Sequence, residues 1–380
     1  MNGGTILLAH ASSELYGSDR VFLESVHAAI ATGRPVVVTL PQDGPLVAEV
    51  GKAGAEVTFC PTPILRKAAL RPAGLLRLVV DAVRALGPMI RLLRRTRPET
   101  VYVNTVTVPL WFPLARLAGA QVLAHVHEAE DAVPRPIRFA LAVPLLAAHT
   151  VVVNSRATGA VLGAALPRLR ARTELVYNGV PGPEKVTEHR EAAEPLRILL
   201  VGRVSPRKGT DVAVDALAAL RRDGVKAELE IVGSIFPGYE WFEADVRAAI
   251  EAGGLADSVR FAGFHDDVWG AYERADIALV PSRVEPFGNT AVEAQLAGVP
   301  VIVSDAQGLP ETVDGGRRGT IVPAGDAAAL ADAIRNLAGD WPAARLRAEL
   351  ARDEAEGKFS VERYRQEIAG LLSTTAKQVT

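Results

Sequence analysis

The chain has very little cysteine, since Cys60 is the only one among its 380 residues. One thiol cannot close an intramolecular disulfide, and it offers no cysteine cluster to a structural metal ion. This composition fits a reducing compartment, so we expect a cytoplasmic protein.

Long apolar runs are lacking too. The longest, Phe139 to Val153, contains Pro144 and His149 and falls short of the roughly 20 residues that a membrane span needs. The N-terminal stretch MNGGTILLAHASS has no basic region, and its apolar run is too short for a signal peptide. The sequence therefore predicts neither a transmembrane helix nor a signal peptide.

Aromatic residues make up only 5% of the chain, and the formal net charge is only -2. The charge is unevenly divided: residues 1–180 hold 19 Lys and Arg against 12 Asp and Glu, and residues 181–380 hold 23 against 32. A slightly acidic chain whose basic residues are not interleaved with aromatic ones does not predict a nucleic-acid partner. The two halves should instead attract different small or surface partners.

A repeated strand-helix rhythm fills both halves of the chain. Short apolar runs alternate with Ala-, Leu- and Arg-rich segments of helical period, which predicts parallel strands joined by helices. The strands expected in the first half are Thr5–His10, Val36–Leu40, Val57–Cys60, Val101–Asn104, Val122–Val126, Val151–Asn154 and Leu175–Tyr177. Those expected in the second half are Ile198–Gly202, Glu228–Val232, Val259–Phe261, Ile277–Val280 and Val301–Val303.

The stretch PGPEKVTEHREAAEP, residues 181–195, has three prolines among charged residues and reads as a linker. We therefore predict an α/β protein with two Rossmann-like domains, residues 1–180 and 196–358, that face a central cleft. A final amphipathic helix within residues 359–380 has no following strand and is free to pack elsewhere. Open α/β sheets bind ligands at the carboxyl ends of their strands, so functional residues should lie in strand-to-helix loops.

The loop ASSELYGSDR follows the first strand. Gly17 permits a close approach of the backbone, and Ser18 or Asp19 is suited to capping the next helix. A helix N-terminus favours an anion, which suggests a phosphate or sugar at this loop. An ordinary strand-to-helix turn needs the same residue types, so both interpretations stay open.

The loop HVHEAED follows the fifth strand. His125 and His127 share a face if the strand reaches that far, and Glu128 is next to them. An H-x-H pair without a distant third ligand is a weak metal signal. We favour His127 as a polar group that hydrogen-bonds a substrate and His125 as a core histidine with satisfied hydrogen bonds.

The segment GRVSPRKGT, residues 202–210, lacks the spacing of a nucleotide-hydrolase P-loop. Arg203 offers a planar fork and Lys208 a mobile point charge, which together suit a diphosphate. A solvated loop is the alternative.

The segment PSRVEPFGNT, residues 281–290, precedes another helix. Gly288 would leave the N–H groups of Asn289 and Thr290 open to an anion. Glu285 and Glu293 are suited to accepting hydrogen bonds from the hydroxyls of a sugar or ribose. Thr290 and Glu293 also have the T-x-x-E spacing of a capping box, which by itself would explain Glu293.

Residues 64–97 carry nine Lys and Arg against one acid, Asp81, interleaved with Leu, Ile and Val. This pattern is suited to an anionic membrane surface. A solvated helix face whose arginine stems cover apolar surface is the other explanation.

Several of these segments together resemble the GT-B retaining glycosyltransferases of family GT4, also called glycosyl transferases group 1. The resemblance rests on GR and KG within residues 202–209, on the pair Glu285 and Glu293 around PFGNT, and on AGVPVIVSDAQGLPETV. It extends over nearly the whole chain, because YGSDR, HVHE, YNGV and GTIVPAGDAAALADAI stand in the order usual for that family.

The resemblance implies transfer of a hexosyl unit from a UDP- or GDP-sugar to the hydroxyl of a glycan, lipid-linked or small-molecule acceptor. It implies retention of configuration, no metal or other cofactor, and a last helix that crosses back to the first domain. A DxD motif is not evident in the sequence, in line with that expectation. A nucleotide-sugar epimerase or isomerase on the same frame is the alternative function.

The resemblance also assigns residues. The catalytic candidates are His127, near the reacting sugar, and Glu285. The donor-binding candidates are Gly17, Arg203, Lys208, Gly263, Phe264, Glu285, Phe287, Gly288, Asn289, Thr290 and Glu293, and the acceptor-side candidates are Glu14, Tyr16 and Glu128. The first loop departs from the family, which often has a glycine pair followed by Ala-Glu where this chain has Gly17, Ser18 and Asp19.

Overall fold

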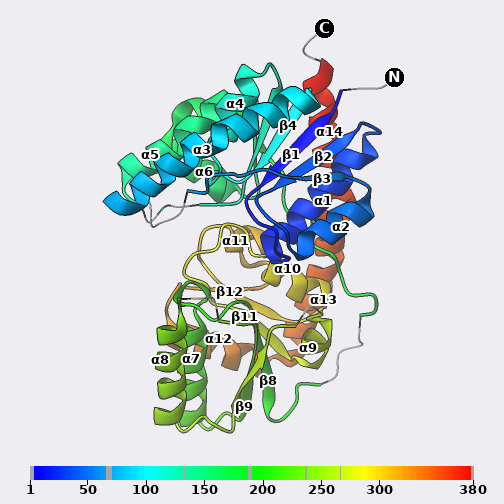
Figure 1. The fold of residues 1–380 in the computed structure, drawn as a ribbon. Coiled ribbons are helices and arrows are strands. Elements are labelled where there is room, and N and C mark those ends of the chain that lie inside the picture. Colours follow the sequence, from blue (N-terminus) through cyan, green and yellow to red (C-terminus); the bar gives the residue numbers. More distant parts are fainter. Residues whose placement is uncertain are drawn as a thin grey trace. The chain divides into compact units, whose positions relative to one another are not determined.

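The computed structural model describes residues 4–65, 71–129, 131, 133–186, 191–235, 238–265 and 267–377 (Figure 1). The chain divides into two compact units. The N-terminal unit comprises Met1–Gly179 together with Val361–Thr380, and the C-terminal unit comprises Val180–Ser360.

The N-terminal unit is built on a seven-stranded parallel sheet of order β3-β2-β1-β4-β5-β6-β7. The central strands β2, β1 and β4 are continuous runs of buried residues, as expected where helices cover both faces of a parallel sheet. The strands are β1 (Ile6–His10), β2 (Val36–Leu40), β3 (Glu56–Phe59), β4 (Thr100–Asn104), β5 (Gln121–Val126), β6 (Thr150–Val153) and β7 (Thr173–Leu175).

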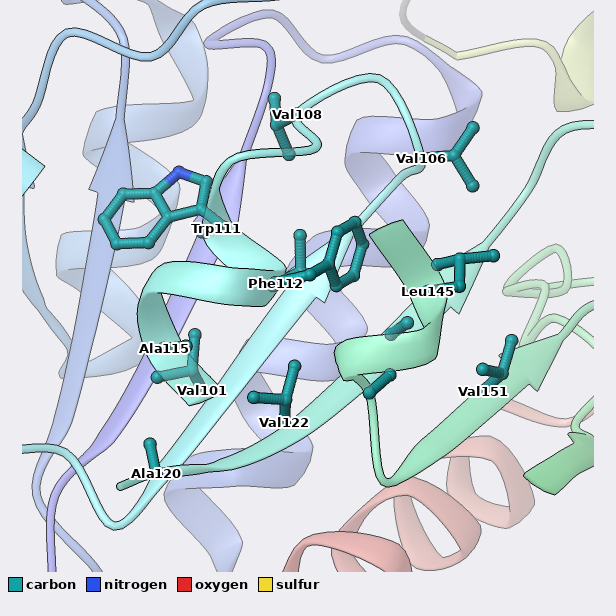
Figure 2. Packing of buried hydrophobic residues seen from close by; sticks show 14 of the residues in the cluster. Val101, Val106, Val108, Trp111, Phe112, Ala115, Ala120, Val122, Leu145 and Val151 are labelled. Atoms are coloured by element: carbon teal, nitrogen blue, oxygen red, sulfur yellow. The ribbon is translucent and has the colours of Figure 1, made fainter. Parts of the chain in front are cut away.

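Helices cover both faces of this sheet. On one face Trp111 and Phe112 of α4 pack among Val101 of β4 and Val122 of β5 (Figure 2). On the other face the last helix of the chain, α14, lies against α1 (Figure 1). The helices of this unit are α1 (Gly17–Ala31), α2 (Pro45–Ala53), α3 (Pro72–Thr96), α4 (Trp111–Leu117), α5 (Arg135–Ala142), α6 (Arg156–Ala165) and α14 (Val361–Lys377).

The C-terminal unit has a six-stranded parallel sheet of order β10-β9-β8-β11-β12-β13. Its strands are β8 (Leu196–Val201), β9 (Ala227–Val232), β10 (Val259–Gly263), β11 (Ile277–Val280), β12 (Val301–Ser304) and β13 (Thr320–Val322). Its helices are α7 (Thr210–Arg222), α8 (Glu240–Ala252), α9 (Trp269–Arg274), α10 (Asn289–Leu296), α11 (Leu309–Thr312), α12 (Ala327–Gly339) and α13 (Trp341–Lys358).

The predicted α/β class with parallel sheets is confirmed. Two details differ from the sequence analysis. Strand β13 was missed, because three residues are too short for a clear pattern, and β7 ends at Leu175 rather than beginning there, because its register is set by pairing with β6. Within the described ranges, none of the helices combines the length and apolar character that crossing a bilayer requires.

Candidate functional site

Each sheet has one place where the strand order reverses, between β1 and β4 in the N-terminal unit and between β8 and β11 in the C-terminal unit. Loops leave the carboxyl ends of these strand pairs in opposite directions, which opens a ligand site in α/β folds. Most of the candidate residues lie on loops at the carboxyl ends of these strand pairs. We call this place in the N-terminal unit the N-terminal edge and the corresponding place in the C-terminal unit the C-terminal edge.

The central contact of the C-terminal edge joins two residues 77 positions apart. Lys208 Nζ donates to Glu285 Oε2 at 2.5 Å, and Ser282 Oγ donates to the same oxygen at 3.3 Å. The side chains are 21% and 12% exposed for Lys208 and Glu285. Burial alone would raise the pKa of Glu285, but the Lys208 ammonium, with smaller effects of Arg207 and the Ser282 hydroxyl, holds that pKa below its ordinary value. The carboxylate is therefore kept ionised beside a cation.

The loops that carry this pair are tied together by arginines. Arg283 binds the Asp211 carboxylate through both terminal nitrogens, at 2.8 and 2.7 Å, and Arg207 Nε donates to the Val284 carbonyl at 3.0 Å. Gly209 lies between the loops with φ of 70°, and a Cβ there would lie 2.1 Å from the Pro281 carbonyl oxygen. Only glycine allows this approach, so the lysine that precedes it is held at the strand ends.

Helix α10 begins at Asn289, and Gly288 is its N-cap with φ of 110°. A Cβ at this glycine would lie 2.4 Å from a Leu309 methyl carbon, so the position requires glycine. The helix start leaves Thr290 as the second helical residue, and its buried hydroxyl has no hydrogen-bond partner among the described residues. The capping-box interpretation of Thr290 and Glu293 is therefore wrong, because Thr290 is not the N-cap.

Glu293 is held by a tyrosine that the sequence analysis missed. The Tyr272 hydroxyl lies 3.2 Å from Glu293 Oε2 and 3.1 Å from the Thr290 carbonyl oxygen, both of which are acceptors. Burial and the Glu293 charge raise the pKa of Tyr272 well above its usual value. A neutral phenol thus orients one oxygen of Glu293. The only sequence signal was a tyrosine on the helix before β11.

The remaining donor-binding candidates of this unit occupy strand ends or the core. Arg203 is exposed just after β8, and Lys208 carbons pass within 3.6 Å of where a Gly202 Cβ would lie. Gly263 ends β10 and is followed by Phe264, which is 52% exposed. Phe287, by contrast, is buried against Phe359, so only its backbone is available to a ligand.

The N-terminal edge is organised differently, around a chain of buried hydrogen bonds. Asp19 Oδ1 lies 2.8 Å from His10 Nε2, Asn104 Nδ2 lies 3.0 Å from His10 Nδ1, and Asn104 Oδ1 lies 2.9 Å from His127 Nε2. The other oxygen of Asp19 accepts from the Tyr16 backbone N–H at 2.9 Å. These hydrogen bonds connect the start of α1 with the end of β5 by way of the ends of β1 and β4.

Two neighbouring histidines meet at the end of β5. The rings of His125 and His127 are 4.0 Å apart, as the shared strand face predicts. His125 Nδ1 is 2.5 Å from the Tyr102 hydroxyl, whereas its Nε2 has no hydrogen-bond partner in the described part of the chain. His125 is thus a core histidine satisfied on one side only. Burial, followed by the effect of His10, lowers the pKa of His127 to about 3, so this imidazole is neutral near pH 7.

The turn after β4 has a positive φ of 125° at Thr105, a conformation that costs about 1–3 kcal/mol in a non-glycine residue. Its backbone N–H donates to the His125 carbonyl at 2.9 Å, and its hydroxyl donates to the Glu128 carboxylate. Glu128 also accepts from the His127 N–H at 3.1 Å, and burial raises the pKa of this carboxyl group. Strain of this kind concentrates at functional sites.

The start of α1 presents several exposed residues at the same edge. Glu14, Tyr16 and Gly17 are all exposed, and Gly17 is the first residue of the helix. Asp19, rather than Ser18, supplies the predicted cap by accepting from the N–H of Tyr16. In the described ranges, no group of three or more His, Cys, Asp or Glu is arranged to hold a metal ion.

Comparison with protein families matches residues 195–340 to the family model Glycosyl transferases group 1. Among curated proteins, glycogen synthase of Mycobacterium tuberculosis is 33% identical over half of this chain and 45% of its own length. A phosphatidyl-myo-inositol mannosyltransferase of Mycobacterium leprae is 37% identical over 44% of this chain and 42% of its own length. The matches thus extend over about half the length of the curated relatives.

Solved structures match nearly the whole chain at low identity. HepE of Anabaena, crystallised with UDP-glucose, is 22% identical with a TM-score of 0.80 and covers 97% of this chain and 99% of its own. A glycosyltransferase of Rickettsia africae is 19% identical with a TM-score of 0.80 and covers 99% and 100%. These neighbours are GT-B glycosyltransferases, and this chain has the same fold.

Proposed function

We propose that the protein is a retaining glycosyltransferase of family GT4, because residues 195–340 match the Glycosyl transferases group 1 model and the chain has a GT-B fold. It would transfer a hexosyl unit from a nucleotide diphosphate sugar to an acceptor hydroxyl without a metal ion. The observation that carries the proposal is the Lys208–Glu285 pair beside the N-terminus of α10. A cation for a diphosphate and an ionised carboxylate for sugar hydroxyls stand side by side there.

The donor would occupy the C-terminal edge. Arg203, Lys208 and the N–H groups at the start of α10 supply the positive charge that a leaving diphosphate needs, in place of a metal ion. Glu285 would accept from hydroxyls of the donor sugar, and Glu293, held by Tyr272, from those of the ribose. HepE was crystallised with UDP-glucose, which makes UDP-sugars the first donors to test.

In the proposed reaction the bond between the anomeric carbon and the diphosphate oxygen breaks, and the acceptor oxygen bonds to the same face of that carbon. The acceptor proton passes to the leaving phosphate oxygen. His127, neutral because of its low pKa, would hydrogen-bond the reacting sugar without adding a positive charge beside the developing oxocarbenium ion.

The test is incubation of the protein with a panel of UDP- and GDP-hexoses, first alone and then with acceptors. The proposal predicts sugar transfer only when an acceptor is present, and an NMR coupling that shows the anomeric configuration of the donor retained in the product. Epimerised donor in the absence of acceptor would favour an epimerase instead. Activity that is lost after chelation and regained with magnesium or manganese would contradict metal independence.

We also propose a peripheral contact with an anionic membrane on the cytoplasmic side, which would give access to a lipid-linked acceptor. Between Pro72 and Arg84, the first turns of α3 bury no side chain completely. The exposed aliphatic residues of these turns are Leu75, Leu76, Val79, Val80 and Val83. Arg77 and Arg84 are exposed beside them, whereas Arg66 and Lys67 lie outside the described residues.

An exposed aliphatic face flanked by arginines is suited to the boundary between lipid head groups and acyl chains. Each cation near an anionic surface contributes about 1 kcal/mol, a term that salt screens. The mannosyltransferase from Mycobacterium leprae is named for phosphatidyl-myo-inositol, a lipid, which supports testing a lipid-linked acceptor.

Sedimentation with vesicles of graded anionic lipid content tests this contact. Binding should weaken with salt and should fall strongly in Leu76→Asp. Leu346→Asp is the matched control, because Leu346 is 58% exposed on α13 of the other unit and Leu76 is 66% exposed. If wild-type protein does not sediment with anionic vesicles at low salt, a soluble or polymeric acceptor becomes the better hypothesis.

A further inference from the structure

We propose that Asp19, His10 and Asn104 are positioning residues that fix the tautomer of His127, with its proton on Nε2 and its lone pair on Nδ1. The inference deepens the proposed function, since it concerns the imidazole placed near the reacting sugar. It follows from the direction in which each hydrogen bond of the buried chain must run.

The direction is set at Asp19. An ionised carboxylate only accepts hydrogen bonds, so His10 must donate from Nε2 across the 2.8 Å contact. A neutral imidazole with its proton on Nε2 has an acceptor at Nδ1, so Asn104 must present its NH₂ group to that nitrogen at 3.0 Å. The amide oxygen then faces His127, and this acceptor requires a proton on His127 Nε2 at 2.9 Å. The Asp19 carboxylate thus orients the His127 imidazole, three residues further along this series of hydrogen bonds.

Neighbouring contacts agree with this orientation. The Tyr102 hydroxyl lies 3.4 Å from Asn104 Oδ1 and donates to it when His125 Nδ1, 2.5 Å from the hydroxyl, carries the proton of their contact; this arrangement also favours the oxygen on this side of the amide. The His10 ring is stacked on Phe22 with centroids 4.3 Å apart and an interplanar angle of 12°, which fixes its plane.

Burial makes the series of hydrogen bonds from Asp19 to His127 favour one direction of proton donation. Asp19 is 2% exposed, His10 is 4% exposed and Asn104 is 1% exposed. Bulk water therefore has little access to these groups and does not replace a mismatched hydrogen-bond partner. Two donors that face each other in such a site each lose a hydrogen bond, and the free-energy cost is the full desolvation penalty of the unpaired group. The reverse tautomer would require a rotated Asn104 amide, which turns its NH₂ group toward His127 and the Tyr102 hydroxyl, together with a proton on Nδ1 of the buried His10 ring.

Asp19→Asn tests the idea because the backbone constrains the new amide. The Tyr16 N–H, 2.9 Å from Asp19 Oδ2, still requires an oxygen, so the NH₂ group of the substituted side chain turns toward His10. His10 must then accept at Nε2 and donate from Nδ1, Asn104 rotates, and His127 receives a donor at Nε2. The variant should therefore reverse the tautomer of His127 with little change in shape, as a carboxylate-to-amide change does in other histidine dyads.

The experiment is ¹⁵N-histidine NMR on the full-length chain. Wild type should show His127 with a protonated Nε2 and an unprotonated Nδ1, and Asp19→Asn should show the opposite. With donor and acceptor, kcat of the variant should fall at least about tenfold while KM for the donor stays within about twofold. Asn104→Ala, which interrupts the chain, should leave His127 as a mixture of tautomers.

A control separates positioning from helix capping, because Asp19 also accepts at the start of α1. Asp326→Asn makes the same carboxylate-to-amide change at an exposed helix cap, where Asp326 accepts from the Ala329 N–H at α12. Either amide oxygen can still accept its helix-terminal N–H, but only Asp19→Asn should change the His127 signals. An unchanged His127 tautomer in folded Asp19→Asn, or a wild-type His127 protonated on Nδ1, would overturn the proposal.

The NMR result does not depend on catalysis. If the tautomers behave as expected but His127 substitution leaves transfer unaffected, the role of His127 in the proposed function fails and the hydrogen-bond chain stands.

Discussion

The N-terminal and C-terminal edges share one topology and differ in chemistry. Both lie where strand order reverses in a parallel sheet. The N-terminal edge holds a neutral His127 at the end of a buried hydrogen-bond chain, whereas the C-terminal edge holds paired charges, Lys208 with Glu285 and Arg283 with Asp211. Topology thus determines where a site forms, and local hydrogen-bond partners determine what the site binds.

The contrast matches the two tasks of the proposed reaction. A leaving diphosphate concentrates negative charge, which paired cations and a helix N-terminus offset. The reacting sugar develops positive charge and needs an oriented, neutral hydrogen-bonding group rather than a cation. Changes at the two edges should therefore have different consequences.

The largest effect is expected for Lys208→Ala. It removes the proposed charge-assisted contact with the diphosphate and leaves Glu285 without its cation, so kcat/KM should fall by a factor that corresponds to about 1.5–3 kcal/mol. Steady-state kinetics and calorimetry with the nucleoside diphosphate provide the measurement. Lys226→Ala is the control, because Lys226 pairs with Glu194 on the exposed surface of the same unit. Unchanged turnover with unchanged nucleotide affinity would refute the role of Lys208.

The next largest effect should separate the two glutamates of the C-terminal edge. Glu285→Gln should lower transfer about tenfold with a smaller change in nucleoside diphosphate affinity, because Glu285 is proposed to bind the donor sugar. Glu293→Gln should weaken nucleoside diphosphate binding, because the Tyr272-held carboxylate is assigned to the ribose. Normal kinetics with reduced stability in both variants would mean that the two glutamates are structural.

A third prediction concerns acid stability at the N-terminal edge. Burial keeps the pKa of His127 near 3 in the folded protein, and the ordinary value is 6.5. Below pH 6.5 His127 is protonated in the unfolded protein but stays neutral in the folded protein. The free energy of unfolding should therefore fall with decreasing pH, by up to about 1.4 kcal/mol per pH unit for this group. Denaturant unfolding from pH 7 to pH 4 should be less pH-dependent in His127→Gln than in wild type. Parallel curves would show that His127 protonates freely in the fold.

The smallest expected effect is a difference in the direction of the pKa shift between one carboxyl group at each edge. The pKa of Glu285 should lie below the ordinary value of 4.5 because Lys208, Arg207 and the Ser282 hydroxyl together outweigh burial, and the pKa of Glu128 should lie above it because of burial. The stability from ionised Glu285 is present above pH 4.5 and is lost as pH falls through its folded pKa. The cost of ionised Glu128 is absent below pH 4.5 and appears as pH rises through its folded pKa. Carbon-13 NMR of the carboxyl groups measures both, and shifts of the same sign would contradict the contrast.

Much of the fold could be predicted from the sequence because parallel strands buried on both faces are nearly continuous apolar runs. The alternation of these runs with helical segments predicted the strands from β1 to β12 and the loops that follow them. Strand β13 was missed because Thr320–Val322 takes its strand character from pairing with β12 rather than from its own pattern.

The candidate residues were recognisable by type and spacing, whereas their partners were not. Tyr272 and Glu293 are 21 positions apart, and Arg283 and Asp211 are 72 positions apart, so these contacts depend on how loops fold together. His10 and Asn104 gave a usable signal that was overlooked, because each is a polar residue that ends an otherwise apolar strand. The capping-box alternative for Glu293 failed because spacing alone does not fix where a helix begins.

The central claim is that the diphosphate of the donor belongs to the C-terminal edge. Calorimetric titration with UDP and GDP, using whichever binds wild type, tests it across four variants. Affinity should fall at least about tenfold in Lys208→Ala and clearly in Glu293→Gln, and it should stay within about twofold in His127→Gln and Asp19→Asn. Equal losses at both edges, or an unchanged affinity in Lys208→Ala, would contradict the account.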